Sequence, residues 1–277
     1  MTNTSCSTAL FRDRDLPAAL DGIAAVGFPQ VELNVREPHV YGSDAAEERR
    51  LTALFAGHAV NARTMHAPAG RSILAVLDEE WLSESVGILS GYLRLAGSLG
   101  LTEMVIHPIP NPSFLPDPDD PALGQKERDG IRRTLDALMP TIEEVGVRVT
   151  LENLPYPDMP LNNMAELREV VAPYPSERVG LIIDLGHAGK VKRDPADEIR
   201  IAGDRLCGTH IHDLDAPDGD VDHHSPALNS YDWVAIRQAF ADIGYQGPWT
   251  MEVSQTSRGE SLEELVAEIS VWLAGWV

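Results

Sequence analysis

The chain has 277 residues, with 43 Asp and Glu against 22 Lys and Arg, so its formal net charge at pH 7 is −21. Because proteins that bind nucleic acid need basic groups to release counterions from phosphates, this charge argues against a nucleic-acid-binding protein. The hydrophobic share of 43% and the charged share of 23% exclude a disordered chain, and the length allows one α/β barrel of about 250 residues or two smaller domains.

A repeated local pattern predicts alternating helices and strands. In each copy a helical segment ends at a glycine, an apolar residue follows, and a short β-rich run then ends at a polar residue. The clearest copies contain Gly27, Gly100, Gly146 and Gly244. We expect each glycine to end its helix with a positive φ, and each following run to form a strand of a parallel sheet.

In chain order, the sequence predicts eight strands and six clear helices. The strands lie near residues 5–10, 30–33, 63–66, 104–107, 147–153, 180–184, 208–212 and 250–253. The helices span residues 16–26, 79–99, 127–145, 163–171, 233–243 and 262–273. Eight strands separated by helices predict an α/β fold, a (β/α)8 TIM barrel, as a single domain over residues 1–277.

A doubly wound open sheet is the alternative fold. It commonly carries a glycine-rich phosphate loop after its first strand, and the sequence has none there. Two long segments without periodicity, residues 108–121 and 213–231, each follow a predicted strand. We expect both to be loops over the mouth of the barrel rather than linkers between domains.

Acidic or imidazole side chains stand at the ends of seven of the eight predicted strands. Such residues are disfavoured in buried apolar runs unless they are paired or bind a metal. Because a barrel gathers its carboxyl-terminal strand ends at one mouth, we predict that they form a metal cluster together with residues of the adjoining loops. The strand-end residues are Glu32, His66, His107, Glu152, Asp184, His210 and Glu252, and the loop residues are His187, Asp222 and His224.

The remaining histidines are weaker candidates for ligands. His39 and His58 lie in loop or helical sequence, and we expect both to be ordinary surface or capping residues. His212 and His223 lie close to the predicted site, but each adjoins a better ligand candidate.

The order of these motifs resembles the xylose isomerase-like TIM barrel superfamily, and within it the sugar phosphate isomerase/epimerase family, which is related to endonuclease IV. The resemblance covers nearly the whole chain. Its most specific pieces are Leu151-Glu152-Asn153, Asp184-Leu-Gly-His187, His210-Ile-His212-Asp213 and Asp222-His-His224. The chain departs from the family at residues 213–216, where epimerases often carry an Arg that holds substrate, and at Pro226-Ala-Leu-Asn229, where a glycine-rich loop is common.

The resemblance implies a site that holds a divalent metal through Glu152, Asp184, His210 and Glu252. Endonuclease IV holds further zinc ions, and the matching residues here would be His66, His107, His187, Asp222 and His224. These five are therefore candidates for additional metal or substrate contacts, and Glu32 and His212 are candidates for substrate binding. A carboxylate-rich site suits Mn²⁺ or Mg²⁺, whereas the additional histidines favour Zn²⁺.

The function implied is a divalent-metal-dependent isomerase or epimerase that acts on a sugar, sugar phosphate or oxo-sugar. The metal would stabilise an enediolate, and Glu152 and Glu252 would be the catalytic residues that transfer the proton. The alternative is an endonuclease IV-like multinuclear zinc phosphoesterase. The net charge argues against it, and few basic residues lie just beyond the predicted strand ends, among them Arg36, Arg71, Lys190 and Lys192.

We expect the protein to bind a small-molecule sugar and to bind neither nucleic acid nor a membrane. The sequence contains no apolar stretch of 18 residues and begins without a secretory signal pattern, and Cys6 and Cys207 lie far apart. These features predict a cytoplasmic protein. A homo-oligomer stays open, because Trp272 and Trp276 on the last helix fit either the core or an interface.

Overall fold

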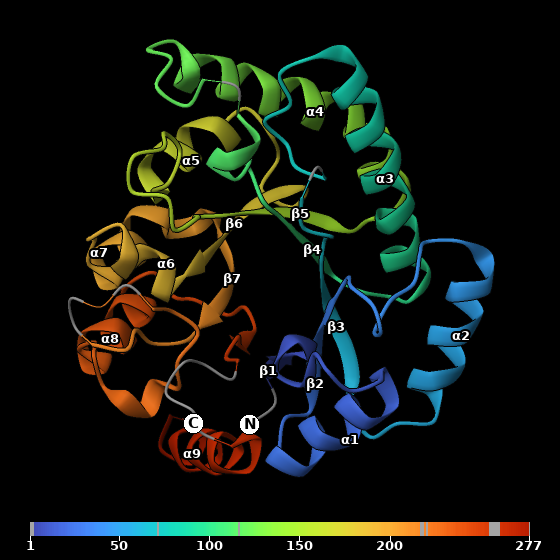
Figure 1. The fold of residues 1–277 in the computed structure, drawn as a ribbon, viewed down its shortest axis with the longest axis vertical. Coiled ribbons are helices and arrows are strands. Elements are labelled where there is room, and N and C mark those ends of the chain that lie inside the picture. Colours follow the sequence, from blue (N-terminus) through green and yellow to red (C-terminus); the bar gives the residue numbers. More distant parts are fainter. Residues whose placement is uncertain are drawn as a thin grey trace.

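Eight parallel strands form a closed barrel in the order of the chain (Figure 1). The structure is a computed structural model that describes residues 3–70, 72–115, 117–216, 219, 221–254 and 261–276. The strands are β1 (Thr4–Ser7), β2 (Gln30–Asn34), β3 (Asn61–His66), β4 (Glu103–Ile106), β5 (Arg148–Glu152), β6 (Val179–Asp184), β7 (Leu206–Ile211) and β8 (Trp249–Met251). The pairing of β1 with β8 closes the barrel and confirms the predicted (β/α)8 TIM barrel fold.

Helices surround the barrel and cover its strands (Figure 1). They are α1 (Leu16–Val26), α2 (Ala45–Ala56), α3 (Glu79–Ser98), α4 (Leu123–Val145), α5 (Met164–Val171), α6 (Leu185–Lys190), α7 (Pro195–Ala202), α8 (Trp233–Asp242) and α9 (Leu262–Trp276). Their buried apolar faces pack on the strands in one continuous core, which includes Leu20 of α1 and Ile142 of α4. This packing holds the carboxyl ends of the strands at one rim of the barrel.

The glycines of the repeated pattern have the predicted backbone conformation. The φ angles of Gly27, Gly100, Gly146 and Gly244 are 107°, 72°, 70° and 65°. A side chain in this left-handed region would clash with its own backbone, so glycine ends each helix and turns the chain into the next strand.

Three helices were not expected from periodicity. In α2 the buried residues are Glu47 and Leu51, so its apolar stripe is too narrow to detect. The helices α6 and α7 are short, and α6 begins immediately after Asp184, whose side chain accepts a hydrogen bond from the His187 backbone N–H. The expected strand at residues 5–10 ends earlier, at Ser7, because the Ser7 side chain caps a 3₁₀ turn over Thr8–Phe11.

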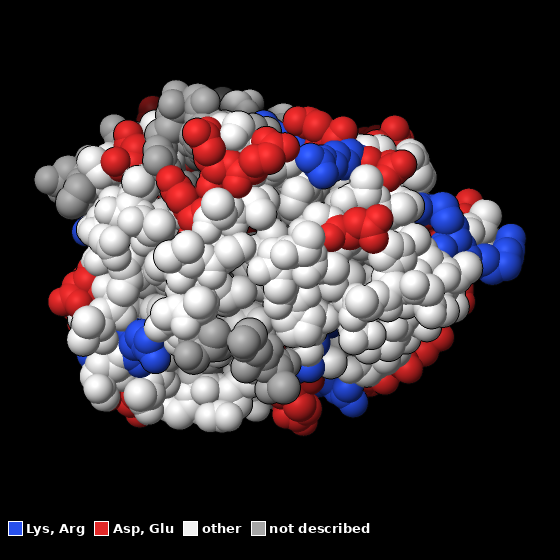
Figure 2. All heavy atoms as spheres, turned by 90° about the horizontal axis from the view of Figure 1, so that it is seen from below, with Lys and Arg blue, Asp and Glu red and all other residues white. Residues whose placement is uncertain are grey.

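The surface does not present a basic groove on the side where Figure 1 places α1 and α9. Figure 2 shows this face as a broad uncharged area with acidic side chains gathered along one edge and few basic ones among the residues described. Within the described ranges, none of the helices combines the length and hydrophobicity that a membrane span requires.

Glu127 lies on the inward face of α4 and is fully buried. Neither of its carboxylate oxygens has a hydrogen-bond partner among the described residues. Burial and the nearby charge of Glu166 raise the pKa of Glu127 to about 8, although the charge of Arg128 acts in the opposite direction. The folded protein therefore favours the neutral acid.

We expect Glu127→Gln to stabilise the protein more at about pH 9 than at about pH 5. Because the folded-state pKa is raised from 4.5 to about 8, the stability contributed by Glu127 is complete below pH 4.5 and is lost as the pH rises through about 8. Gln cannot ionise, so the benefit of the substitution should grow by about 2–4 kcal/mol between the two conditions in urea denaturation. The matched control is Glu143→Gln on the exposed face of α4. Equal effects of Glu127→Gln at both pH values would contradict the buried acid.

Candidate active site

Four acidic or imidazole side chains converge at the carboxyl ends of four consecutive strands. Glu152 ends β5, Asp184 ends β6, His210 lies near the end of β7, and Glu252 follows β8. Each offers one ligand atom, and these atoms lie within 4.8 Å of one another. All four residues are buried. We call these four residues the carboxylate cluster.

One nitrogen of His210 faces all three carboxylates of this cluster. Its Nδ1 lies 2.8 Å from Glu252 Oε2, 3.0 Å from Glu152 Oε1 and 3.7 Å from Asp184 Oδ2. A ring nitrogen carries one hydrogen at most, so it cannot satisfy three carboxylates at once.

Charge in the cluster reinforces this geometry. Burial disfavours a charged His210, yet the carboxylates of Glu252, Glu32 and Glu152 raise its pKa well above its ordinary value. Burial likewise opposes ionisation of Glu152, but His210 and the other nearby histidines hold its pKa well below the usual range. The cluster therefore holds more negative than positive charge in a buried space. This donor set of carboxylate oxygens and imidazole nitrogen fits a divalent cation.

A second group of ligand atoms consists of His66, His107 and Glu152. Glu152 Oε2 is buried without a hydrogen-bond partner, and it lies 3.4 Å from His66 Nε2 and 3.5 Å from His107 Nε2. His66 Nδ1 donates a hydrogen bond to the carbonyl of Ala67 at 2.8 Å, which directs Nε2 toward Glu152. Burial lowers the pKa of His107 to about 4, which leaves its ring neutral with a free lone pair at neutral pH. Two imidazole nitrogens and one carboxylate oxygen are suitable ligands for zinc.

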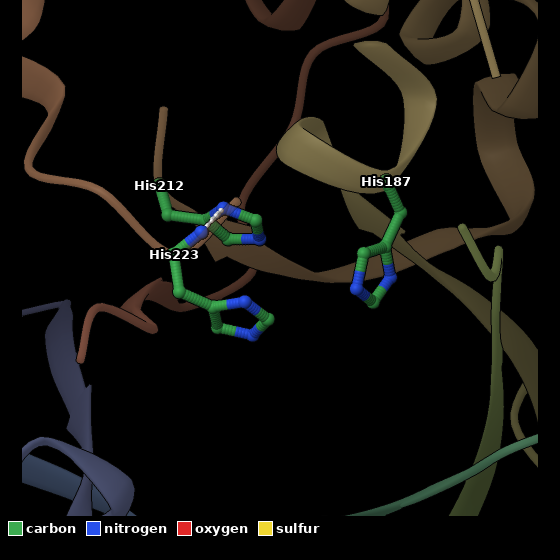
Figure 3. Close-up of side chains that lie close together, drawn as sticks. All are labelled: His187, His212 and His223. Carbon is green, nitrogen blue, oxygen red and sulfur yellow. Dashed lines mark hydrogen bonds between the residues drawn. The ribbon is translucent and has the colours of Figure 1, made fainter. Parts of the chain in front are cut away.

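A third group, His187, His212 and His223, satisfies the same distance criterion (Figure 3). His212 cannot be a ligand there, because both of its ring nitrogens are already engaged. Its Nε2 lies 2.8 and 2.9 Å from the two carboxylate oxygens of Asp184, and its Nδ1 accepts the backbone N–H of His223 at 2.9 Å. His212 instead orients Asp184 from outside the carboxylate cluster.

The residues expected as an Asp-x-His ligand pair are separated in the structure. Asp222 Oδ2 lies 3.0 Å from the ammonium group of Lys190 and 4.0 Å from His187 Nε2. His224 is buried, and its backbone pairs with Asp213 in an isolated β-bridge. Within the part of the chain that the structure describes, no group of close ligand atoms includes His224.

Glu32 and His212, which the resemblance implied as substrate-binding residues, contact other residues of the site in the structure. Both side chains are fully buried. Glu32 Oε1 lies 3.0 Å from His210 Nε2, and Glu32 Oε2 accepts a hydrogen bond from Thr64 at 3.0 Å. Their polar atoms are thus occupied in holding His210 and Asp184, and we reassign both as positioning residues.

His39 and Arg71 are two further residues for which the sequence raised an expectation. His39, expected to be an ordinary surface or capping residue, is buried, and its Nε2 lies 3.1 Å from the carbonyl of Arg14. Arg71, expected near a strand end, lies outside the described residues.

Two positioning residues, Asn153 and Gly186, were missed by sequence analysis. The Asn153 amide donates to the Asp184 carbonyl at 2.9 Å and accepts the Asp184 N–H at 2.8 Å, which fixes the end of β6 against β5. A Cβ atom at Gly186 would overlap the ring of His212. Both residues lie close in sequence to the predicted ligands Glu152 and Asp184, and this was the only indication of their importance that the sequence offered. Their roles become clear only from the packing.

A cavity of about 570 Å³ opens above the carboxylate cluster. This volume is in the usual range for a small-molecule site. Its lining combines Glu152 and Glu252 with imidazoles and a few larger side chains from the surrounding loops. The polar lining residues are Asn34, Arg36, Glu37, His66, His107, Tyr156, His187 and His223.

Sequence comparison identifies the family. Residues 20–274 match the xylose isomerase-like TIM barrel family. The chain belongs to this family. This confirms the predicted resemblance and agrees with the closed barrel.

Similar proteins include several sugar epimerases. A D-psicose 3-epimerase of Enterocloster bolteae is 33% identical over 149 residues, which are 53% of this chain and 46% of that relative, so the match spans about half the relative's length. A solved structure of D-psicose 3-epimerase in the presence of D-fructose aligns with a TM-score of 0.80 at 16% identity, over 99% of this chain and 97% of that one. A structure of the IolI protein with a bound zinc atom aligns with a TM-score of 0.76 at 17% identity, again over 99% and 97%. The two structural matches establish the shared fold.

We expect Gly186→Ala to lower the free energy of unfolding by about 1–3 kcal/mol, because the new methyl group would displace the His212 ring. The shift should also weaken Mn²⁺ binding in isothermal titration calorimetry, since His212 orients Asp184. Gly87→Ala on α3 is the matched control, because open space surrounds that position. Unchanged stability and Mn²⁺ affinity in Gly186→Ala would show that His212 does not require this space.

Proposed function

We propose that this protein is a divalent-metal-dependent epimerase or isomerase of a keto sugar. The observation that carries the proposal is the convergence of Glu152, Asp184 and Glu252 on one nitrogen of His210 beneath a cavity of small-molecule size. The names of the relatives support the substrate class, because several act on ketoses such as D-psicose.

The carboxylate cluster would hold the metal through Glu152, Asp184, His210 and Glu252. A bound divalent cation would act as a Lewis acid that polarises the substrate carbonyl and stabilises an enediolate. Manganese, magnesium and zinc all accept ligands of these types, and the imidazoles nearby favour zinc or another transition metal.

Glu152 and Glu252 are the residues of the cluster that also line the cavity. Glu152 ends β5 and Glu252 follows β8, and these strands are not neighbours in the barrel, so the two carboxylates would reach a sugar bound in the cavity from different strands. One would remove the proton from the carbon beside the carbonyl, and the other would return a proton from its own side. Asp184 and His210 do not line the cavity, and they would complete the metal site without transferring protons.

A multinuclear zinc phosphoesterase is a second candidate function. It is favoured by one observation, the unpartnered Glu152 Oε2 between His66 Nε2 and His107 Nε2, which fits a second ion. The third group of close ligand atoms does not extend this series, because His212 is fully engaged. Asp222, a further predicted ligand outside that group, is paired with Lys190. The net charge of −21 also opposes an anionic polymer as substrate.

We expect Glu152→Gln and Glu252→Gln each to reduce turnover by at least about 10³-fold, since each removes a metal ligand and a proton-transfer group. The assay is deuterium incorporation beside the carbonyl of D-psicose, D-fructose and D-tagatose in heavy water with Mn²⁺, followed by NMR. Glu48→Gln on the exposed face of α2 is the control. Wild-type exchange in either active-site variant would rule out the assigned roles.

We expect His66→Ala to remove a weaker second ion and to leave the ion of the carboxylate cluster bound. His66 contacts Glu152 only at Oε2, whereas the cluster uses Oε1. Metal content by mass spectrometry after Zn²⁺ loading and dialysis measures both sites. Loss of all zinc would contradict this division, and zinc-dependent cleavage of an abasic DNA duplex without exchange into any sugar would favour the phosphoesterase.

A further inference from the structure

His223 projects from the loop after β7 into the cavity. It is 30% exposed, whereas the side chains of His210 and His212 are fully buried. Figure 3 shows its ring beside that of His212, and the two rings stack with centroids 4.3 Å apart and planes 9° from parallel. The ring of His187 lies 5.8 Å away across the cavity.

The backbone of His223 is held in an uncommon conformation. Its φ of 61° lies in the left-handed region, which residues other than glycine adopt only with support from their surroundings. The support comes from both sides of the residue. Its N–H donates to His212 Nδ1 at 2.9 Å, and its carbonyl accepts the Ser254 N–H at 3.0 Å. Since His212 also bonds to Asp184, the position of His223 is fixed relative to the carboxylate cluster.

Asp222 fixes the orientation of the ring. Its Oδ1 lies 3.1 Å from His223 Nδ1, while its Oδ2 lies 3.0 Å from Lys190 Nζ. In the neutral ring this contact directs the hydrogen to Nδ1, and Nε2 then carries the lone pair. No group among the described residues forms a hydrogen bond with Nε2.

We propose that His223 is a specificity-determining residue, whose Nε2 accepts a hydrogen bond from the C1 hydroxyl of the substrate, on one of the two carbons that flank the carbonyl. This inference rests on the proposed function. Two observations place His223 close to Glu252, the proposed proton-transfer group. His223 and Glu252 line the same cavity, and the backbone bond from Ser254 brings the His223 loop beside the end of β8. The ligand is a polyhydroxylated ketose with a free C1 hydroxyl.

The test is isothermal titration calorimetry of the Mn²⁺-loaded protein with D-fructose, D-psicose and D-tagatose and with their 1-deoxy analogues. The wild type should bind the parent sugars about tenfold more tightly, as one hydrogen bond permits. His223→Asn, whose amide lies near the Nδ1 position, should lose this preference. His223→Gln, whose amide reaches the Nε2 position, should restore part of it. His58→Phe, outside the cavity, is the control and should keep the full preference.

Three results would overturn the proposal. If His223→Asn keeps the wild-type preference for the C1 hydroxyl, Nε2 does not bind it, while the proposed function stands. If His223→Asn and His223→Gln lose affinity equally for parent and deoxy sugars, the role of His223 is structural. If the wild type binds none of the ketoses, the proposed function fails and this inference fails with it. The His223→Phe variant, which keeps the stacked ring, replaces His223→Asn if the latter does not fold.

Discussion

Three carboxylates share one imidazole nitrogen at the mouth of this barrel. Glu152, Asp184 and Glu252 lie within 3.7 Å of His210 Nδ1, and all four residues are buried. Like charges in such a space repel strongly, and one N–H cannot compensate three of them. The remaining negative charge is the reason that the cluster fits a cation, and the surrounding structure serves to keep these four side chains in place despite their repulsion.

The residues that hold the carboxylate cluster in place use their polar side-chain atoms in hydrogen bonds and ion pairs. Glu32 and Thr64 hold His210 from one side, and His212 holds Asp184 from another. Asn153 joins the ends of β5 and β6 through the Asp184 backbone. Buried polar networks of this kind are costly when one member is missing, so the roles of these residues are coupled. The same network extends through His212 to the backbone of His223, which connects the carboxylate cluster to the cavity lining.

The arrangement of charge also separates the two candidate functions. A phosphoesterase acting on a polymer would need several exposed cations around its metals. Near this site Lys190 is paired with Asp222, and Arg36 is the one arginine among the residues that line the described cavity. A neutral sugar needs hydrogen-bonding groups instead, and the cavity supplies several imidazoles. The second pair of histidines, His66 and His107, allows a further ion without requiring a change of substrate.

The barrel could be predicted without any knowledge of tertiary contacts, and so could a larger set of strand-end residues that includes the carboxylate cluster; the family resemblance singled out its four members. Gly27, Gly100, Gly146 and Gly244 mark helix ends through their backbone conformation, which is a local property of the chain. Strand periodicity then placed Glu152, Asp184 and Glu252 at strand ends, and the topology of a parallel barrel brings those ends together.

The roles of the remaining side chains could not be predicted in this way, because they depend on packing. His212 and His223 are alike in sequence context, yet the ring of His212 fills the space above Gly186 and faces Asp184, whereas that of His223 faces the cavity. Likewise, the pairing of Asp222 with Lys190 and the burial of His224 depend on how the loop after β7 folds back on the barrel. The direction of a side chain follows from packing between segments that are distant in the sequence, and a short motif does not specify those distant neighbours.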